Sequence, residues 1–158
     1  MSTETETIFL RRAVELAADN VRRGGRPFGS LVVVDGEVVA EGVNSTVTSN
    51  DPAAHAETQA IRVACRERDT LRLDGALVYA SGEPCVMCQS LGKAVGIREM
   101  VFALSTTEAA AAGWPYTEES LRLHAAWTDA ADGYARHAGV PGAEQPVAAW
   151  AAEQARTS

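Results

Sequence analysis

Cysteine is scarce in this sequence of 158 residues, which contains only Cys65, Cys85 and Cys88. Cys85 and Cys88 form a Cys-x-x-Cys pair, but no second pair exists to complete a structural zinc site of four cysteines, so that class of site is excluded. A redox-active dithiol remains an alternative from this spacing alone. Cys65 is expected to be a small buried residue. So few cysteines, two of them suited to bind a metal as thiolates, favour a reducing compartment, and we expect the protein to be cytoplasmic.

Long apolar runs are also missing, and basic residues are in the minority. No stretch approaches the length that spans a bilayer, and the N-terminus lacks the basic-then-apolar form of a signal peptide. The 14 Lys and Arg residues are outnumbered by 21 Asp and Glu residues, which gives a net charge of −7. Proteins that grip a phosphate backbone usually present a basic surface. The sequence therefore disfavours a nucleic-acid substrate and predicts no membrane association.

What is present is an alternation of helix and strand signals. Residues 29–34 and 38–42 predict a hairpin, because they flank Asp35-Gly36, a favoured two-residue turn. We further expect a helix ending at Gly24-Gly25, a helix over 52–66, a strand over 77–80, a helix from 84 to about 95, a strand over 100–104, and short helices over 109–112, 118–131 and 146–155. The composition, with 46% hydrophobic and 22% charged residues, is that of a globular protein. The length predicts one ordinary domain over residues 1–158. The predicted fold class is α/β: a three-layer α/β/α sandwich around a mixed β-sheet, with an antiparallel hairpin and later strands that run parallel.

Two motifs carry most of the chemical information. His55-Ala56-Glu57 is followed later in the chain by Pro84-Cys85-Val86-Met87-Cys88. One imidazole and two thiolates can hold a zinc ion with one coordination position left open, and zinc lowers the pKa of a water molecule bound there. Glu57 is then left as a proton carrier beside the metal. A His-x-Glu motif followed by Pro-Cys-x-x-Cys is the signature of zinc-dependent deaminases.

The spacing within these motifs has a physical reason. Cys85 and Cys88 are three residues apart and share one face of a helix that Pro84 is suited to open. The positive end of that helix dipole favours both thiolates. His55 and Glu57 are two residues apart, so they can converge only from the first turn of a helix, for which Asp51-Pro52 offers a cap and a start. We therefore expect two helix starts to point at one metal ion.

From about residue 9 to residue 113, the chain resembles the cytidine-deaminase superfamily, and within it the bacterial guanine deaminases. Besides the two metal motifs, the matching pieces are Phe9-Leu10-Arg11-Arg12-Ala13-Val14, Pro27-Phe28-Gly29, Glu41-Gly42-Val43-Asn44 and Thr48-Ser49-Asn50-Asp51-Pro52. The resemblance implies that His55, Cys85 and Cys88 bind Zn²⁺ and that Glu57 moves protons. It also implies hydrolytic deamination of a free amino-substituted nucleobase, with release of ammonia. A homodimer is expected, with residues 140–158 contacting the partner subunit or exchanged with it.

The substrate contacts expected from the resemblance are Phe28, Asn44, Ala56, Trp114 and Tyr116. The guanine enzymes carry an Asp that shuttles protons in the segment that corresponds to Gly113-Trp114-Pro115-Tyr116, and this chain has no Asp there. Glu118 or Glu119 is expected to take that role.

Three further departures concern the surroundings of the substrate. Lys93-Ala94 replaces an aromatic pair, Gly82 replaces a Cys, and the usual late aromatic residue near the pocket is missing, with Trp150 as the late aromatic residue that remains. Tyr116 and Lys93-Ala94 stand in place of groups that serve a bicyclic purine in the guanine enzymes. We therefore hypothesise that a monocyclic ring, such as a cytosine analogue or an aminotriazine, is turned over at least as well as guanine.

Two other functions compete with this interpretation. A tRNA adenosine deaminase shares both metal motifs, but it should carry a basic C-terminal helix to grip RNA, whereas residues 140–158 contain only Arg156 as a basic residue. A zinc-stabilised binding module would have no use for Glu57, which is not a ligand. Individual residues also have simpler interpretations. Asn44 can serve a turn, Phe28 can belong to the core, and His124 and His137 are expected at the surface.

Overall fold

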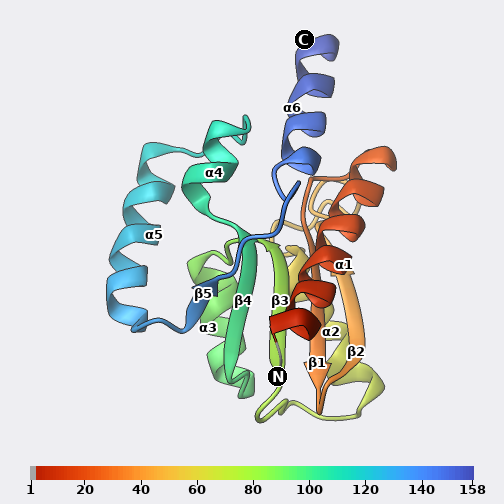
Figure 1. The fold of residues 1–158 in the computed structure, drawn as a ribbon, viewed down its shortest axis with the longest axis vertical. Helices are drawn as coiled ribbons and strands as arrows, with labels where there is room; N and C mark the ends of the chain where they lie inside the picture. The colour runs from red at the N-terminus through yellow and green to blue at the C-terminus, as the bar shows by residue number, and fades with distance from the viewer. Residues whose placement is uncertain (1–2) are drawn as a thin grey trace.

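A computed structural model describes residues 3–158 and shows a five-stranded sheet with helices on both faces (Figure 1). In chain order the elements are α1 (Thr3–Arg22), β1 (Gly29–Val34), β2 (Glu37–Val43), α2 (Ala56–Glu67), β3 (Leu77–Gly82), α3 (Val86–Val95), β4 (Glu99–Leu104), α4 (Thr106–Ala111), α5 (Glu118–Ala131), β5 (Ala135–His137) and α6 (Gln145–Thr157). The strands lie in the order β2-β1-β3-β4-β5.

The sheet is mixed, as the sequence predicts. β1 pairs antiparallel with β2 and with β3, whereas β3, β4 and β5 run parallel. The hairpin closes through Asp35 and Gly36, whose φ angles of 51° and 83° are those that its two-residue turn requires. β5 has no counterpart in the prediction. It spans only three residues, too few to show the alternation of a strand, and it forms because it pairs with β4 from Met100 to Phe102.

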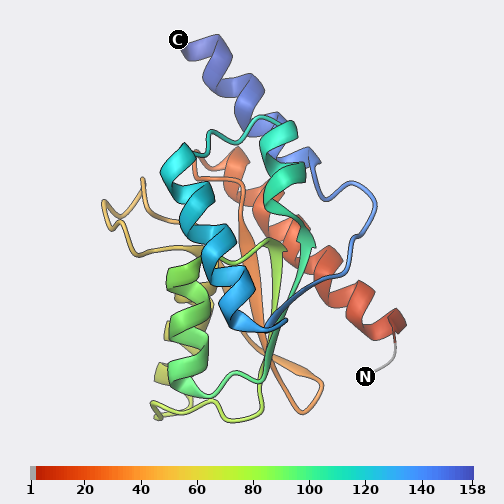
Figure 2. The same cartoon turned by 90° about the vertical axis from the view of Figure 1, so that its left-hand side faces the viewer.

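Successive residues of one strand face opposite layers, as the strand period of two requires. Leu31 and Val33 of β1 belong to a core cluster shared with α1, α4 and α6, whereas Val32 belongs to a second cluster shared with α2 and the end of α5. Figure 2 shows the sheet edge-on between α1 on one side and α3 with α5 on the other. The α/β/α sandwich predicted from the sequence is confirmed.

The helix that carries His55 begins later than predicted, and the expectation of a helix from residue 52 was wrong. Asp51 does cap a turn, because its Oδ1 accepts a hydrogen bond from the backbone N–H of Ala53 at 2.9 Å. That turn is not helical: the Ala54 N–H donates to Asp51 O, and Asn50 before it has a φ of 51°. α2 starts only after His55, at Ala56.

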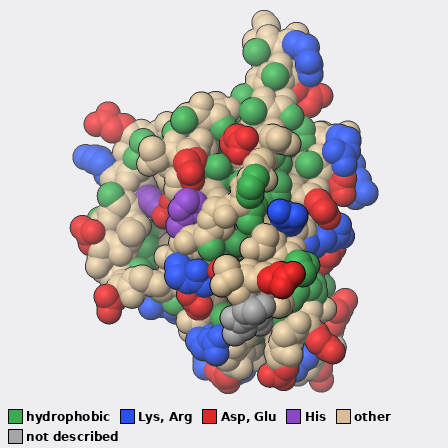
Figure 3. Space-filling model, viewed as in Figure 1, with side chains coloured by type: hydrophobic (Ala, Val, Ile, Leu, Met, Phe, Trp, Pro, Cys, Tyr) green, Lys and Arg blue, Asp and Glu red, His purple; other side chains and the backbone are tan. Residues whose placement is uncertain are grey.

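The C-terminal helix α6 stands out from the body of the molecule (Figures 1 and 3). Its first turn is anchored through the buried Pro146 and Val147, whereas residues 152–158 are exposed. Hydrophobic side chains are visible on the projecting part in Figure 3. None of the helices within residues 3–158 combines the length and the apolar composition needed to cross a membrane.

Candidate active site

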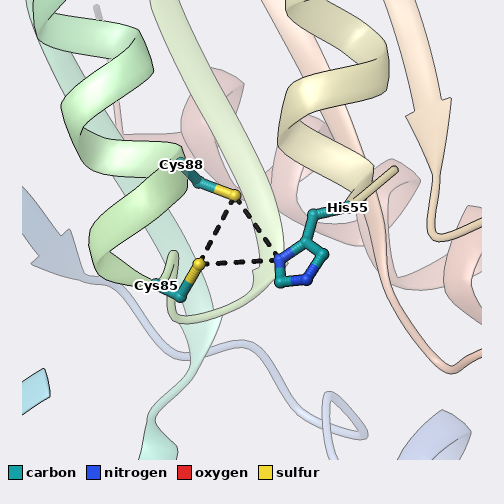
Figure 4. Close-up of side chains that lie close together, drawn as sticks. All are labelled: His55, Cys85 and Cys88. Carbon is teal, nitrogen blue, oxygen red and sulfur yellow. Dashed lines mark hydrogen bonds between the residues drawn. The ribbon is translucent and has the colours of Figure 1, made fainter. Parts of the chain in front are cut away.

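Three potential metal ligands from the two motifs meet at one point (Figure 4). His55 Nδ1 lies 3.5 Å from Cys85 Sγ and 3.6 Å from Cys88 Sγ, and the two sulfur atoms are 3.7 Å apart. The group therefore joins the residue before α2 to the start of α3, as the spacing predicts.

These distances fit a tetrahedral zinc ion. With zinc–sulfur bonds of about 2.3 Å and a zinc–nitrogen bond of about 2.0–2.1 Å, two ligand sulfurs lie about 3.8 Å apart and sulfur and nitrogen about 3.6 Å apart. The His55, Cys85 and Cys88 side chains match both values within about 0.1 Å. Two thiolates and one imidazole are also the ligand types that zinc prefers, and three protein ligands leave one position open.

The backbone explains why the ligands converge. His55 is the N-cap of α2 and Cys85 is the N-cap of α3, and neither side chain is used to cap its own helix. Cys88 follows as the third residue of α3 and points to the same spot (Figure 4). Pro84 comes just before the cap rather than at the first helical position, which is two residues later, at Val86. Two helix starts, with their positive dipole ends, thus face the thiol groups.

The two thiols differ in how readily they lose a proton. The contact between the Cys85 and Cys88 Sγ atoms lowers the pKa of Cys85, and His55 acts in the same direction, whereas the same contact and burial raise the pKa of Cys88. The hydrogen bond with Cys85 raises the pKa of His55 in return. Thr58, a buried residue in the first turn of α2, places its hydroxyl 3.6 Å from Cys88 Sγ. Thr58 was not singled out in the sequence; its hydroxyl can donate to a Cys88 thiolate and help to orient this ligand.

Glu57 lies directly beside the ligand group. Its side chain is buried, and its Oε2 lies 3.4 Å from Cys88 Sγ. Burial is the main reason that the pKa of Glu57 is raised above its ordinary value. Glu57 nevertheless borders a cavity of about 310 Å³ and is therefore accessible to a small bound molecule.

This cavity is the place where most of the expected substrate contacts meet. Its lining residues are Arg26, Phe28, Asn44, His55, Glu57, Glu83, Cys85, Trp114, Pro115, Tyr116, Thr117 and Ser120. Phe28, Asn44, Trp114 and Tyr116, all expected at the substrate, are thus brought together. Ala56 is fully buried and is not among the lining residues. As the first residue of α2, it can reach a ligand only through its backbone N–H, which the helix itself does not use.

Asn44 combines the two roles considered from the sequence. Its Oδ1 accepts hydrogen bonds from the backbone N–H and the hydroxyl of Thr46, so it does shape the turn after β2. Within residues 3–158 its Nδ2 has no hydrogen-bond partner, although the residue is buried and borders the cavity. Asn44 therefore presents an unused donor to a ligand.

Aromatic side chains form one wall of the cavity. The Phe28 and Trp114 rings meet edge to face at 4.7 Å, and Trp150 of α6 packs behind Trp114 at 4.8 Å. Gly82, which replaces a Cys of the guanine enzymes, is explained by the ring beside it, because a Cβ at this position would lie 2.8 Å from the Phe28 ring. Gly82 thus leaves room for the ring. Burial raises the pKa of Tyr116, next to this wall, to about 12, so its hydroxyl stays protonated.

Three residues from the sequence arguments lie elsewhere. Glu118 and Glu119 are exposed in the first turn of α5, where Thr117 and Ser120 line the cavity but the two glutamates do not. Lys93 is exposed on α3, and its Nζ lies 4.4 Å from the centre of the Tyr134 ring. The expectation that Lys93-Ala94 borders the substrate was therefore wrong for the cavity of this chain.

Sequence reasoning assigned no role to Glu83 and Arg26, which line the cavity, or to His124, which is bound to Glu83. Glu83 accepts hydrogen bonds from the Thr106 N–H and from His124 Nε2, each at 2.8 Å. Burial opposes ionisation of Glu83, but these hydrogen bonds outweigh it and lower its pKa, while Glu83 raises the pKa of His124. His124 is half-buried rather than at the surface, so that expectation was wrong. Arg26 also lines the cavity, and its guanidinium lies over the Trp114 ring at 5.7 Å.

Comparison with known proteins gives a consistent picture. The sequence profile described as the cytidine and deoxycytidylate deaminase zinc-binding region matches residues 3–104, which include all three ligand residues and Glu57. A guanine deaminase from Bacillus subtilis is 46% identical over 107 residues, which make up 67% of this chain and 69% of the relative. A tRNA-specific adenosine deaminase from Aquifex aeolicus is 36% identical over 95 residues, 60% of this chain and 63% of the relative.

The solved structures agree with the sequence matches. The crystal structure of guanine deaminase from Bacillus subtilis superposes with a TM-score of 0.66 at 37% identity, covering 82% of this chain and 95% of that chain. The matched stretch of the tRNA-specific enzyme, by contrast, is less than two thirds of its length. With its ligand geometry and the match over residues 3–104, the chain belongs to the zinc-binding cytidine and deoxycytidylate deaminase family and is a hydrolytic deaminase.

Proposed function

We propose that the protein deaminates a free amino-substituted nucleobase or a similar heterocycle. The observation that carries this proposal is the buried Glu57 carboxylate, which borders a cavity of about 310 Å³ beside the three ligands. That volume lies at the lower end of the range for ligand pockets, about 300–1,000 Å³, and suits a free base better than a larger substrate.

The residues divide the reaction between them. When bound by His55, Cys85 and Cys88, zinc lowers the pKa of a water molecule at its open position and so makes a nucleophile available near neutral pH. Glu57 is placed to take the proton from the attacking water, to deliver it to a ring nitrogen and to assist departure of the amine as ammonia. The Asn44 amide donates to a ring acceptor, and the Ala56 N–H, at the start of α2, is the second candidate donor.

A second proton carrier is proposed at Glu118 or Glu119. Their neighbours Thr117 and Ser120 line the cavity, so the first turn of α5 borders the substrate even though both glutamates are exposed. In this proposal the turn moves so that one carboxylate reaches the side where the amine departs.

The preferred ring is proposed to be monocyclic or, secondarily, guanine. The relative from Bacillus subtilis is a guanine deaminase. In this chain, however, Tyr116 stands where the guanine enzymes carry a carboxylate, and a phenol that stays protonated cannot replace a proton-accepting group. An unpaired buried polar partner can change discrimination between substrates by about 10,000-fold.

A tRNA adenosine deaminase is the alternative that the sequence leaves open. The net charge of −7 and the lone basic residue Arg156 among residues 140–158 count against it, because RNA binding depends on phosphate contacts. The experiment that separates the alternatives is an ammonia-release assay of the zinc-loaded protein with guanine, cytosine, an aminotriazine, the matching nucleosides and a tRNA anticodon stem-loop. We expect turnover of free rings; turnover confined to the stem-loop contradicts the proposal.

A homodimer is proposed in which residues 140–158 contact the partner or are exchanged with it. The outer half of α6 has little contact with its own chain, and a short helix is marginally stable alone in water. Because Trp150 of α6 packs on Trp114, a partner subunit that binds α6 would also stabilise the aromatic wall of the cavity. Light scattering at micromolar concentration tests the dimer, and a monomer contradicts it. The three free cysteines support a reducing compartment, for which we propose the cytoplasm.

A further inference from the structure

Arg26 is the cavity residue that the deamination chemistry leaves without a task. It is the one Lys or Arg among the residues that line the cavity. Within residues 3–158 its guanidinium forms no hydrogen bond or ion pair with another side chain, whereas the cavity carboxylate of Glu83 is bound by His124 and Thr106. An unpaired guanidinium beside a small cavity, in a protein of net charge −7, marks a local site for an anion.

Hydrogen bonds and neighbouring residues fix the backbone of Arg26. Its carbonyl accepts a hydrogen bond from the buried Asn20 side chain at 2.7 Å, and the same Nδ2 donates to the carbonyl of Asn44 at 2.8 Å. A Cβ at Gly25 would lie 2.5 Å from the Asn20 amide, so the chain needs glycine there. Pro27 follows and restricts the Arg26 backbone to extended conformations. Arg26 and Asn44 are thus held by one shared buried amide.

The side chain is oriented as well. The guanidinium lies 5.7 Å from the centre of the Trp114 ring, a cation–π contact, and Trp114 is itself fixed between Phe28 and Trp150. A guanidinium stacked on an aromatic face keeps its N–H fork free for planar acceptors, above all carboxylates. Arg26 also borders a neighbouring hollow with Thr46 and Val47, so there is space for a substituent beside it.

We propose that Arg26 binds a negatively charged edge of the substrate ring, so that the site selects an anionic amino-heterocycle. This inference rests on the proposed function and specifies its substrate class. The negative edge has two sources with the same chemistry, a carboxylate attached to the ring or a ring whose acidic N–H has ionised. Asn44 orients the ring and Arg26 adds charge selection, while Glu57 and the metal ligands act on the amine side.

The test uses two pairs of substrates in which one member is anionic. Guanine is compared with 8-azaguanine, whose extra ring nitrogen makes its N–H more acidic. The comparison is made at a pH above the pKa of the 8-azaguanine N–H. Cytosine is compared with 5-carboxycytosine. The enzymes are zinc-loaded wild type, Arg26→Gln, Arg26→Lys and the control Arg23→Gln, which removes the same charge from an exposed position outside the cavity. Zinc content and circular dichroism verify that each variant is folded.

For Arg26→Gln we expect the kcat/KM ratio of the anionic to the neutral member to fall by about 10- to 100-fold in at least one pair, as for a lost hydrogen bond to a charged group. The pair that responds identifies the source of the charge. The ratio for Arg26→Lys should lie between those of wild type and Arg26→Gln, because lysine keeps the charge without the guanidinium fork. The ratio for Arg23→Gln should match wild type. An unchanged ratio in both pairs overturns the inference.

Failure of the proposed function is recognised separately. If no free ring releases ammonia with wild type, the affinities of 8-azaguanine and 5-carboxycytosine for wild type and Arg26→Gln are measured by calorimetry. Weaker binding to Arg26→Gln by about 10-fold or more still supports the anion site. Equal binding, or Arg26-dependent turnover of the tRNA stem-loop alone, contradicts it.

Discussion

Residues 3–104 and residues 105–158 build the same cavity in different ways. The first region matches the deaminase family and holds His55, Cys85, Cys88 and Glu57 at helix starts that pack against the sheet. The second region lies outside that match and contributes residues 114–117 and Ser120. The ligands and Glu57 thus belong to the first region, whereas the walls of the cavity are shared, because Arg26, Phe28 and Asn44 of the first region also line it.

The two regions also differ in how firmly they are packed. The first contains most of both core clusters, whereas α5 buries only Ala131 and α6 only Pro146 and Val147. Elements with few buried contacts open at lower free energy than the core. Substitutions of the metal ligands or of Glu57 are thus expected to remove the reaction, and those in the second region to change its efficiency and its substrate.

The largest effect is expected from loss of a metal ligand. Cys85→Ala should reduce the zinc content from one ion per chain to near zero and abolish ammonia release, because two ligands bind zinc much more weakly than three. Metal analysis and activity are measured together. Cys65→Ala is the matched control, since Cys65 lies outside the ligand group. Full zinc occupancy in Cys85→Ala would show that this cysteine is not a ligand.

Glu57→Gln should retain zinc and the fold but lose activity. General acid–base catalysis contributes about 100- to 10,000-fold, and Glu57 serves in more than one proton transfer, so kcat should fall by at least about 1,000-fold. Glu67→Gln, at the exposed end of the same helix, is the control and should match wild type. Turnover of Glu57→Gln near the wild-type rate would remove Glu57 from the proton path.

Much of the first region could be predicted from the sequence, because its signals are local. The Asp35-Gly36 turn defines the hairpin, and the two motifs identify the ligand group. The start of α2 was misplaced for an equally local reason: Asp51-Pro52 has the composition of a helix cap, but Asp51 closes a non-helical turn. Composition alone does not distinguish the two uses of an aspartate side chain.

The second region was harder to predict because its contacts join residues far apart in the chain. Glu83 and His124 are 41 residues apart, and no periodic pattern connects them. Arg26 meets Trp114 across a still longer separation. The first region holds one case of the same kind, because the need for glycine at position 82 follows from the place of the distant Phe28 ring. Such pairings become visible only in three dimensions.

A smaller effect is expected from the proposed second proton carrier. Glu118→Gln or Glu119→Gln should lower kcat by about 10- to 100-fold, at the lower end of acid–base contributions because both carboxylates are exposed and must move to reach the cavity. Each variant serves as the control for the other, since they remove the same charge from adjacent positions. Unchanged kcat in both would exclude the role while leaving zinc and Glu57 unaffected.

The smallest expected effect concerns the link between the two regions, the ion pair of Glu83 and His124. Their side chains are 12% and 18% exposed, and Oε1 lies 2.8 Å from Nε2. The hydrogen bond with Glu83 raises the pKa of His124 above its ordinary value of 6.5. Burial works against the lowered pKa of Glu83, which His124 and Thr106 maintain below 4.5.

The pH window follows from these directions. A raised His124 pKa stabilises the fold fully below pH 6.5, and this contribution is lost as the pH rises through the folded-state pKa. A lowered Glu83 pKa stabilises it above pH 4.5, and this is lost as the pH falls through the folded-state pKa. The pair is therefore strongest between these two values and weakens in alkaline solution.

His124→Gln should accordingly lower the free energy of unfolding by about 1 kcal/mol near pH 6, a value at the upper end for exposed ion pairs because this one is partly shielded. Denaturant unfolding of zinc-loaded protein should show a smaller difference from wild type near pH 9, where less of His124 is protonated. Glu83→Gln and the double variant complete a cycle that isolates the pair from other effects of either substitution. A coupling energy that is the same at both pH values would show that charge does not hold α5 to the metal-binding region, and that packing alone positions this wall of the cavity.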